Sequence, residues 1–421
     1  MDRGTRHRDA GRRGLFGNQV GGLAASSAPC TVRGVARCLR GVALVMLVGL
    51  AVAACGSSSS SSSSDPSGSS GSSAPSSSTA STSATSAANL AAAQAGVAAF
   101  SGKPSAFPVS EPLKKPLPVG SKFVYLEASD PIGALLGTLL KPAVQAVGGT
   151  FDAIPAGNSA SAAQAAASTA IADKPAAVLI PAFLPSEFGG KLQALRSEGA
   201  SIVGAGMVGW QHYGIQSCVN CDAYETQMAK LLADWAVAKQ GAKTDAVFYT
   251  VPELSFTALM WKTFKAQVAT LCPKCTARSL PIDVSTIGTT APQTIVNDLQ
   301  SNSSTNVAVF STMDMAQGLP AALSAAGLHV LTIGQAPTPE NLQDIKDGKL
   351  TAGVGSDLPS LAWTMVDAGA RLAIGQQPQA SEGFTPIQVL EQKDITFDPT
   401  HGWTGYPDFA QRYAKLWHPH G

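Results

Sequence analysis

From residue 122 onward, short and almost continuously apolar runs alternate with longer segments that are rich in alanine and leucine. The short runs have the composition of parallel strands that are covered on both faces, and the longer segments have the length of helices. Glycine, asparagine, aspartate and proline occupy the turns between them. This regular alternation predicts an α/β fold built from doubly wound parallel sheets.

The alternation forms two successive series, which are separated by a break near residues 209–218. The first series is predicted to have strands at 123–126, 150–154, 176–180 and 201–203, and helices at 131–147, 159–172 and 186–198. The second is predicted to have strands at 245–250, 276–284, 307–310 and 329–333, and helices at 223–239, 255–269, 292–300 and 315–326. Two such series predict two parallel-sheet lobes.

A separate apolar run, residues 41–54, lies before the first series and ends at Cys55. Three arginines within residues 33–40 precede it, so the order is that of a secretory signal. As a helix the run would rise about 21 Å, which is too short for the ~30 Å hydrocarbon core of a bilayer. The motif Val52-Ala53-Ala54-Cys55 resembles the lipobox of bacterial lipoproteins, which implies that Cys55 is lipidated, for example with palmitate, and that residues 1–54 are a signal peptide. An ordinary secreted protein with a chance cysteine is the alternative.

The segment after Cys55 consists almost entirely of serine, glycine, alanine and proline through about residue 88. Such a composition cannot bury enough apolar surface to order itself. Residues 89–120 read as a second connector, which contains several prolines and one or two helical turns. Residues 55–120 are therefore predicted to form a lipidated, flexible linker.

The charge of the chain without its leader is weakly negative. Residues 1–54 hold eight arginines and two aspartates, so 21 Lys+Arg and 26 Asp+Glu remain after their removal. No basic patch survives, which argues against nucleic acid as a partner. The remaining part from residue 121 is long enough for a large core and is close to the length at which chains divide into two domains.

Three later stretches carry a resemblance to a known family. Residues 307–318 read as a strand followed by a polar residue, Asp314 and a helix; residues 331–349 and 350–359 continue the same order of strands, turns and helices. This order is similar to that of the type I periplasmic binding proteins, the ribose-binding-like receptors of sugar ABC transporters, and the resemblance extends over residues 122–394.

In this family the chain passes between the lobes three times, and the resemblance implies passages near residues 214–218, 356–359 and 383–385. The implied N-terminal lobe comprises residues 121–217 and 357–384. The implied C-terminal lobe comprises residues 218–356 and 385–400, and a tail helix lies within 401–421.

Candidate ligand-binding residues follow from a rule that does not depend on the family, since ligands of open α/β sheets bind beyond the carboxyl ends of the strands. Suitable hydrogen-bonding and stacking side chains at these positions are Glu127, Ser129, Asp130, Trp210, Phe256, Asp314, Gln335 and Asp357. Asp130 and Asp314 are equally suited to be helix N-caps. Related sugar binders carry an Asp–Arg pair after the fourth strand, but this chain has Gly206-Met207 there, so a bidentate arginine clamp is not visible.

Four cysteines other than Cys55 follow the leader, as the pairs Cys218–Cys221 and Cys272–Cys275. Two local disulfides suit an oxidising exterior. Zinc binding and cross-linked pairing are the alternatives, although zinc ribbons place their cysteine pairs closer together than these are.

No arrangement of a nucleophile with a base is visible, and no phosphate-binding loop is present. The glycines of residues 204–209 match a dinucleotide-binding spacing, but no helix is predicted to follow them. The sequence therefore predicts a protein that is not an enzyme and uses no metal or cofactor.

The combined prediction is an extracytoplasmic, lipid-anchored, monomeric solute-binding protein. It would deliver a small polar molecule, with a sugar as one candidate, to an ABC permease in the membrane through hinge closure of two lobes. The alternative is an envelope lipoprotein that senses a ligand without a role in transport.

Overall fold

The computed structural model describes residues 78–104 and 106–418. The predicted signal peptide, the lipidation site Cys55 and the first part of the predicted linker lie outside the described residues. None of the described helices is long and apolar enough to span a membrane.

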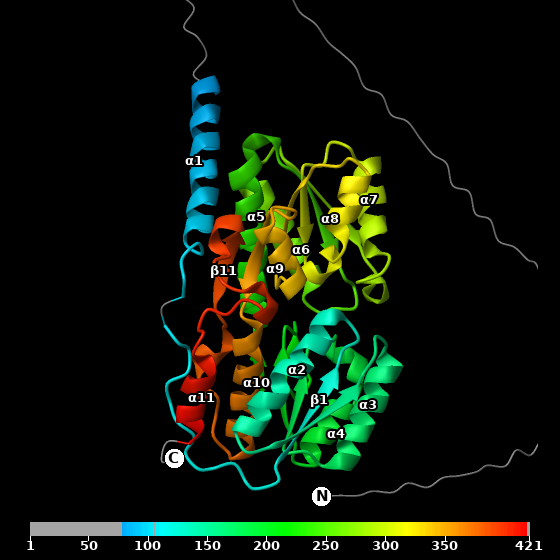
Figure 1. The fold of residues 1–421 in the computed structure, drawn as a ribbon, viewed down its shortest axis with the longest axis vertical. Coiled ribbons are helices and arrows are strands. Elements are labelled where there is room, and N and C mark those ends of the chain that lie inside the picture. The colour runs from blue at the N-terminus through cyan, green and yellow to red at the C-terminus, as the bar shows by residue number, and fades with distance from the viewer. Residues whose placement is uncertain (1–77, 105, 419–421) are drawn as a thin grey trace, which may run out of the picture. The chain divides into compact units, whose positions relative to one another are not determined.

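The first lobe is built on a five-stranded parallel sheet with the order β2-β1-β3-β4-β5. Its strands are β1 (Lys122–Glu127), β2 (Thr150–Pro155), β3 (Ala177–Ile180), β4 (Ser201–Ala205) and β5 (Ser217–Val219). Helices α2 (Pro131–Ala146) and α10 (Leu358–Ala373) cover one face, and α3 (Ala160–Asp173) and α4 (Lys191–Ser197) cover the other. The sheet is therefore buried on both faces, as its apolar strands require (Figure 1).

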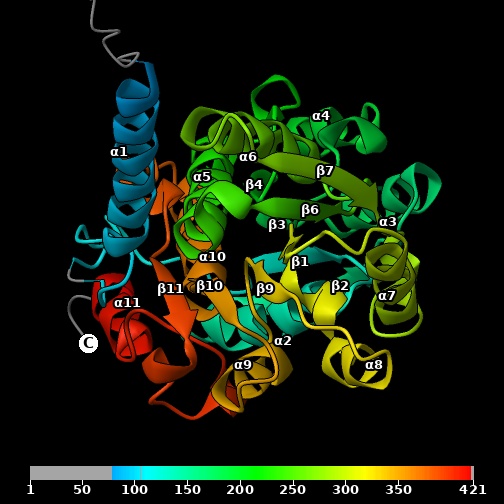
Figure 2. The same cartoon turned by 90° about the horizontal axis from the view of Figure 1, so that it is seen from above.

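The second lobe is built on a four-stranded parallel sheet with the order β7-β6-β8-β9. Its strands are β6 (Asp245–Thr250), β7 (Thr276–Pro281), β8 (Val307–Phe310) and β9 (Leu331–Gly334). Its helices are α5 (Asp222–Gln240), α6 (Thr257–Leu271), α7 (Ala291–Ser301), α8 (Leu319–Ala325) and α9 (Pro339–Lys346). Helices α5 and α6 lie on one side of this sheet, and α7 and α8 lie on the other (Figure 2).

An antiparallel pair, β10 (Ala352–Ser356) and β11 (Ile387–Glu391), adjoins the second sheet. Its apolar side chains join the core formed by α5, α6 and β6. The predicted fold of two doubly wound parallel-sheet lobes is confirmed.

The passages of the chain between the two lobes can be located from these elements. The first follows Val219, because the three-residue strand β5 still pairs with β4, whereas the sequence placed the passage at residues 214–218. The second lies between β10 and α10, and the third precedes β11. Asn220 connects the first and third passages, since its Nδ2 donates to Thr385 Oγ1 at 2.8 Å and its Oδ1 accepts from the Thr385 N–H at 2.9 Å.

The described part of the predicted flexible linker, from residue 78 onward, is folded. Residues Ser78–Ala98 form a helix of 21 residues, α1, which packs beside α5 (Figure 1). Ala93 is fully buried there in a small apolar cluster with Val237 and Leu271. An alanine-rich composition favours a helix intrinsically, and this contact supplies the packing that composition alone cannot reveal.

The connector after α1 is also part of the fold. Val109, Leu113 and Leu117 are buried in the core of the first lobe, and the Leu113 N–H donates to the Leu416 carbonyl at 2.9 Å. Leu416 belongs to the C-terminal helix α11 (Phe409–Trp417), whose Trp417 stacks on Trp363 of α10. These contacts hold residues 107–118 against α10 and α11.

This packing predicts the outcome of two truncations. Removing residues 1–120 should lower the free energy of unfolding by about 4 kcal/mol or more, because burying each large aliphatic side chain contributes about 1.5–3 kcal/mol. Removing residues 1–77 should leave it unchanged, since α1 and the connector are retained. Urea denaturation of both proteins measures the difference. Equal midpoints for the two truncations would show that the connector contributes no stability.

Candidate functional site

A cavity lies where the carboxyl ends of the strands of both lobes meet, and it encloses about 640 Å³ with its open mouth included. It is bounded by the loop before α2, the end of β4 and the start of α5, and by the loops before α6 and after β9. Its polar lining residues include Asp130, Asn220, Glu225, Thr312, Gln335 and Ser356. The position agrees with the rule that ligands bind beyond the carboxyl ends of parallel strands.

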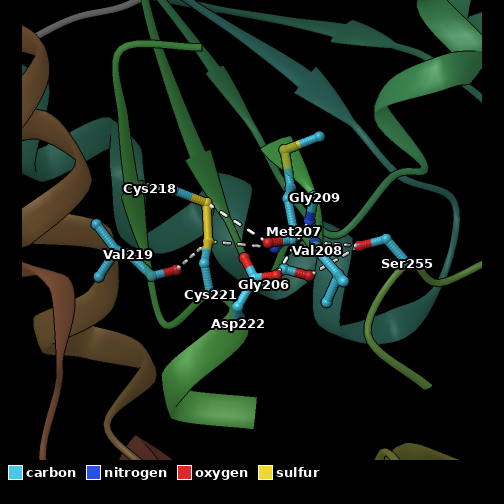
Figure 3. Close-up of a disulfide and its surroundings, with 9 residues drawn as sticks. All are labelled: Gly206, Met207, Val208, Gly209, Cys218, Val219, Cys221, Asp222 and Ser255. Carbon is cyan, nitrogen blue, oxygen red and sulfur yellow. Dashed lines mark hydrogen bonds between the residues drawn. A yellow bond between two sulfur atoms is a disulfide. The ribbon is translucent and has the colours of Figure 1, made fainter. Parts of the chain in front are cut away.

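Ser255, in the loop before α6, joins the two lobes beside this cavity. Its N–H donates to the Ala182 carbonyl at 2.8 Å, and its hydroxyl donates to the Gly206 carbonyl at 3.0 Å. The same hydroxyl accepts from the Val208 N–H at 3.3 Å (Figure 3). Ser255 thus bonds to two loops of the opposite lobe, to one through its backbone and to the other through its side chain.

Of the predicted site residues, Asp130, Phe256 and Gln335 line the cavity. Asp130 is buried and caps α2, since its Oδ1 accepts from the Gly133 N–H at 2.9 Å. Gly133 itself allows α2 to begin this close to β1, because a Cβ there would lie 2.5 Å from the Ala128 carbonyl oxygen. Burial raises the pKa of the Asp130 carboxyl above its ordinary value, and the hydrogen bonds from the backbone partly offset this rise.

Asp314 lies behind the cavity wall and is 1% exposed. Its carboxylate accepts from the hydroxyl of Thr312, a lining residue, at 2.8 Å. Burial, and then the negative charge of Asp130, raise the pKa of Asp314 to about 7. The two aspartates that the sequence placed on different lobes are therefore close enough to interact electrostatically across the cleft.

Glu225, in the first turn of α5, is a lining residue that the sequence did not indicate. It is 3% exposed, and its Oε2 has no hydrogen-bond partner among the described residues. Burial raises the pKa of Glu225 to about 8, and a hydrogen bond with the Gln335 side chain offsets part of that rise. The Oε1 of Gln335 is likewise buried and without a partner among the described residues. Two acceptor atoms in one cavity are thus open to a ligand.

The position of Glu225 in the sequence is one indication that it borders the cleft. Glu225 stands four residues after Cys221, shortly beyond the first passage between lobes that the sequence predicted at residues 214–218. In two-lobed folds the passages border the cleft, so the start of the next helix faces it. Strand β5 has only three residues and was not predicted, so the end of the first passage and the position of Glu225 beyond it were not recognised from the sequence.

The remaining predicted site residues are not brought into the cavity lining. Glu127 is half-buried at the end of β1, and Ser129 is exposed and bonds to Asn158. Trp210 packs against the apolar cluster that lies under α3 and α4. Their roles in ligand binding remain predictions.

Asp357 is fully buried, and its carboxylate has structural partners. It caps α10 by accepting from the Ser360 N–H at 2.9 Å, and it accepts from the Thr404 hydroxyl at 3.0 Å and from the Gly405 N–H at 2.8 Å. This set of bonds fixes α10 to the C-terminal segment. A ligand role for Asp357 remains a prediction.

Both predicted disulfides are present, Cys218–Cys221 and Cys272–Cys275. The first lies beside the Met207 loop, since the Met207 N–H donates to Cys221 Sγ at 3.3 Å (Figure 3). Its turn contains the cavity-lining Asn220, which adopts a left-handed conformation with φ of 54°. The disulfide therefore constrains a strained turn at a passage between the lobes.

Comparisons with known proteins agree with this architecture. Residues 123–377 match the family described as "Periplasmic binding protein domain". No curated protein shows significant similarity to the chain.

Solved structures with the same fold share little sequence with the chain. A glucose-galactose binding protein from Geobacillus stearothermophilus is 15% identical, with a TM-score of 0.57 over 66% of this chain and 99% of that one. A carbohydrate transporter solute binding protein from Agrobacterium radiobacter, in complex with D-arabinose, is 18% identical, with a TM-score of 0.58 over 67% and 98%. A 5-methylthioribose transporter solute binding protein from Thermotoga lettingae is 12% identical, with a TM-score of 0.60 over 71% and 99%.

Proposed function

Because the chain belongs to the periplasmic binding protein family, whose members bind solutes and are not enzymes, we propose that it is an extracytoplasmic, lipid-anchored receptor that delivers a small polar molecule to an ABC importer. The observation that carries this proposal is the cavity between the two lobes. Groups from both lobes line it, so a ligand that bonds to both would favour the closed arrangement.

The chemistry of the cavity supports a ligand that donates hydrogen bonds. The open acceptors are the Oε2 of Glu225 and the Oε1 of Gln335. The carboxyl of Asp130 also lines the cavity. Sugars are candidates, since solved structures of this fold include proteins described as binding D-arabinose, 5-methylthioribose, glucose and galactose. Their hydroxyl groups are donors that such acceptors can use.

The leader supports the proposed location. The basic segment, the short apolar run and the small residues before Cys55 have the order of a lipoprotein signal. Lipidation at Cys55 would hold the receptor at the membrane that contains its permease. The serine-rich segment that follows would separate the folded lobes from the lipid.

Cys55→Ser tests the anchor and the transport role together. We expect the variant to leave the membrane fraction, or to remain unprocessed, and uptake of the cognate solute to fall, because a released receptor is diluted away from its permease. Fractionation, immunoblotting and uptake of a radiolabelled solute, selected by thermal-shift screening of sugars and amines, measure these effects. Cys38→Ser is the matched control, since this leader cysteine does not follow a run of small residues.

Two results would contradict the proposal in different ways. Membrane-bound and normally processed Cys55→Ser protein would remove the lipid anchor. Unchanged uptake in cells that lack the whole gene would favour the sensing role over delivery to an importer.

A further inference from the structure

The cavity between the lobes has an unbalanced charge. Its described lining holds two carboxyl groups, those of Asp130 and Glu225, and no lysine or arginine. Neither carboxyl forms an ion pair within the described part of the chain. Their hydrogen bonds replace only part of the hydration that a buried carboxylate loses when no cation lies beside it.

More acidic groups surround this lining. Asp314 lies behind it and interacts with Asp130. A smaller adjoining cavity, which shares Asp130 and Leu254 with the first, contains Glu187 and Glu253. The Oε2 of Glu253 is buried and has no hydrogen-bond partner among the described residues. The cleft therefore presents carboxyl groups to a ligand from several directions, with no lysine or arginine among its described lining residues, which disfavours anionic ligands.

Most of the remaining wall is apolar. It includes Ile132, Leu136, Leu254, Phe256, Leu358 and Leu361. A sugar bearing hydroxyl groups on every side would lose hydration against such a wall without regaining hydrogen bonds. A ligand with an apolar body and one concentrated donor group is a better match.

We propose, on the basis of the solute-binding function above, that the cavity binds a small organic cation: a protonated primary amine attached to a compact apolar body. The ammonium group has three N–H donors. It would bond to Glu225 Oε2 and Gln335 Oε1, the two buried acceptors that are open, and would lie in the field of Asp130. The apolar body would contact Phe256 and the leucines. The burial that raises the pKa of Glu225 supports this assignment, since an adjacent cation would return that carboxyl to its charged form.

The experiment compares three probes with the same phenyl group and similar size, whose head groups are cationic, neutral and anionic: 2-phenylethylamine, 2-phenylethanol and phenylacetate. Calorimetry with the wild-type protein at pH 7.5 should give the amine at least about a tenfold lower Kd than the alcohol, which is the order of one charge-assisted hydrogen bond. Phenylacetate should bind more weakly than the alcohol. This comparison requires no variant.

Glu225→Gln keeps the shape of the side chain and removes its charge. We expect it to reduce the advantage of the amine over the alcohol at least about fivefold. Glu198→Gln is the matched control, because it removes the same charge from an exposed position outside the cavity, and the advantage should be unchanged.

Equal Kd values for amine and alcohol, or an amine advantage that Glu225→Gln leaves intact, would overturn the proposal. So would tighter binding of D-arabinose or glucose than of the amine, although that result would leave the solute-binding function standing. Failure of the amine, the alcohol and every sugar to bind would count against both.

Discussion

Replacing Arg371 with methionine is expected to lower the free energy of unfolding by about 3–5 kcal/mol, the usual cost of leaving a buried charge without its partner. Arg371 and Asp367 lie one turn apart on α10, and both side chains are 0% exposed. The Arg371 Nε donates to Asp367 Oδ2 at 2.5 Å. Removing the guanidinium would take away the cation that Arg371 places beside the buried Asp367 carboxylate.

The pair also joins three segments, which adds to the expected loss. The Arg371 Nη2 donates to the Glu111 carbonyl in the connector, and the Trp417 Nε1 of α11 donates to Asp367 Oδ1 at 2.6 Å. Without Arg371, the connector loses a charge-assisted hydrogen bond. The loss should therefore appear as a lower midpoint of the whole cooperative transition in urea.

Arg412→Met is the matched control. Arg412 and Asp408 have the same spacing along a helix, but both are largely exposed, so the loss should be about 1 kcal/mol or less. A second variant, Arg371→Met with Asp367→Leu, removes both charges and should recover part of the stability. If Arg371→Met were no less stable than Arg412→Met, the buried pair would not be a significant support of the first lobe.

Glu225→Gln is expected to make the protein more stable than wild type at alkaline pH and to remove part of its pH dependence. Burial raises the pKa of Glu225 in the folded protein to about 8, from an ordinary value of 4.5. Between these two values the folded state holds a proton that the unfolded state has lost. Its contribution to stability is therefore complete below pH 4.5 and is lost as the pH rises to about 8.

Glutamine has the same shape and never ionises, so the variant should lose none of this stability over that range. At pH 8.5 we expect the Tm of the variant to exceed that of wild type by at least about 3 °C, with a smaller difference at pH 5. Asp314, whose pKa is also raised, contributes a dependence of the same sign to both proteins, so the informative quantity is their difference.

Differential scanning calorimetry without ligand, from pH 5 to pH 9, measures this difference. Glu198→Gln, on the surface, is expected to follow the wild-type curve. A constant difference between Glu225→Gln and wild type across this range would show that the carboxyl keeps an ordinary pKa and that water reaches it.

Much of the fold could be predicted from the sequence because its strands are buried on both faces. Such strands are short apolar runs, and the runs of β1, β6 and β8 could be recognised without tertiary information. Strand β5 was missed because three residues are too few for a pattern. Helix α1 was missed because its serine- and alanine-rich sequence resembles a linker until its packing on α5 is known.

The site was predicted less completely, for a geometric reason. A strand pattern indicates where a strand ends, and it placed Asp130 and Gln335 at the cavity. It does not indicate the direction of a side chain. Trp210 and Asp357 therefore follow strands but are directed into structural contacts. Glu225 belongs to the cavity only because of the way in which the second lobe faces the first.

The connector that packs on α10 has a mechanical consequence. Helix α1 is attached to the second lobe through α5, and the Phe100 carbonyl accepts from the Val389 N–H of β11 at 2.8 Å, whereas residues 107–118 are attached to the first lobe. The chain between them is a fourth covalent link across the boundary that the three passages already cross, and it runs along the side that carries β11 (Figure 1). Because the four links lie on one side, the lobes can move apart on the opposite side. The same links oppose rotation of one lobe relative to the other about the axis that joins them. The two lobes should thus open by hinge bending about this side, with little twist. A force on the proposed lipid anchor would be transmitted to these four links.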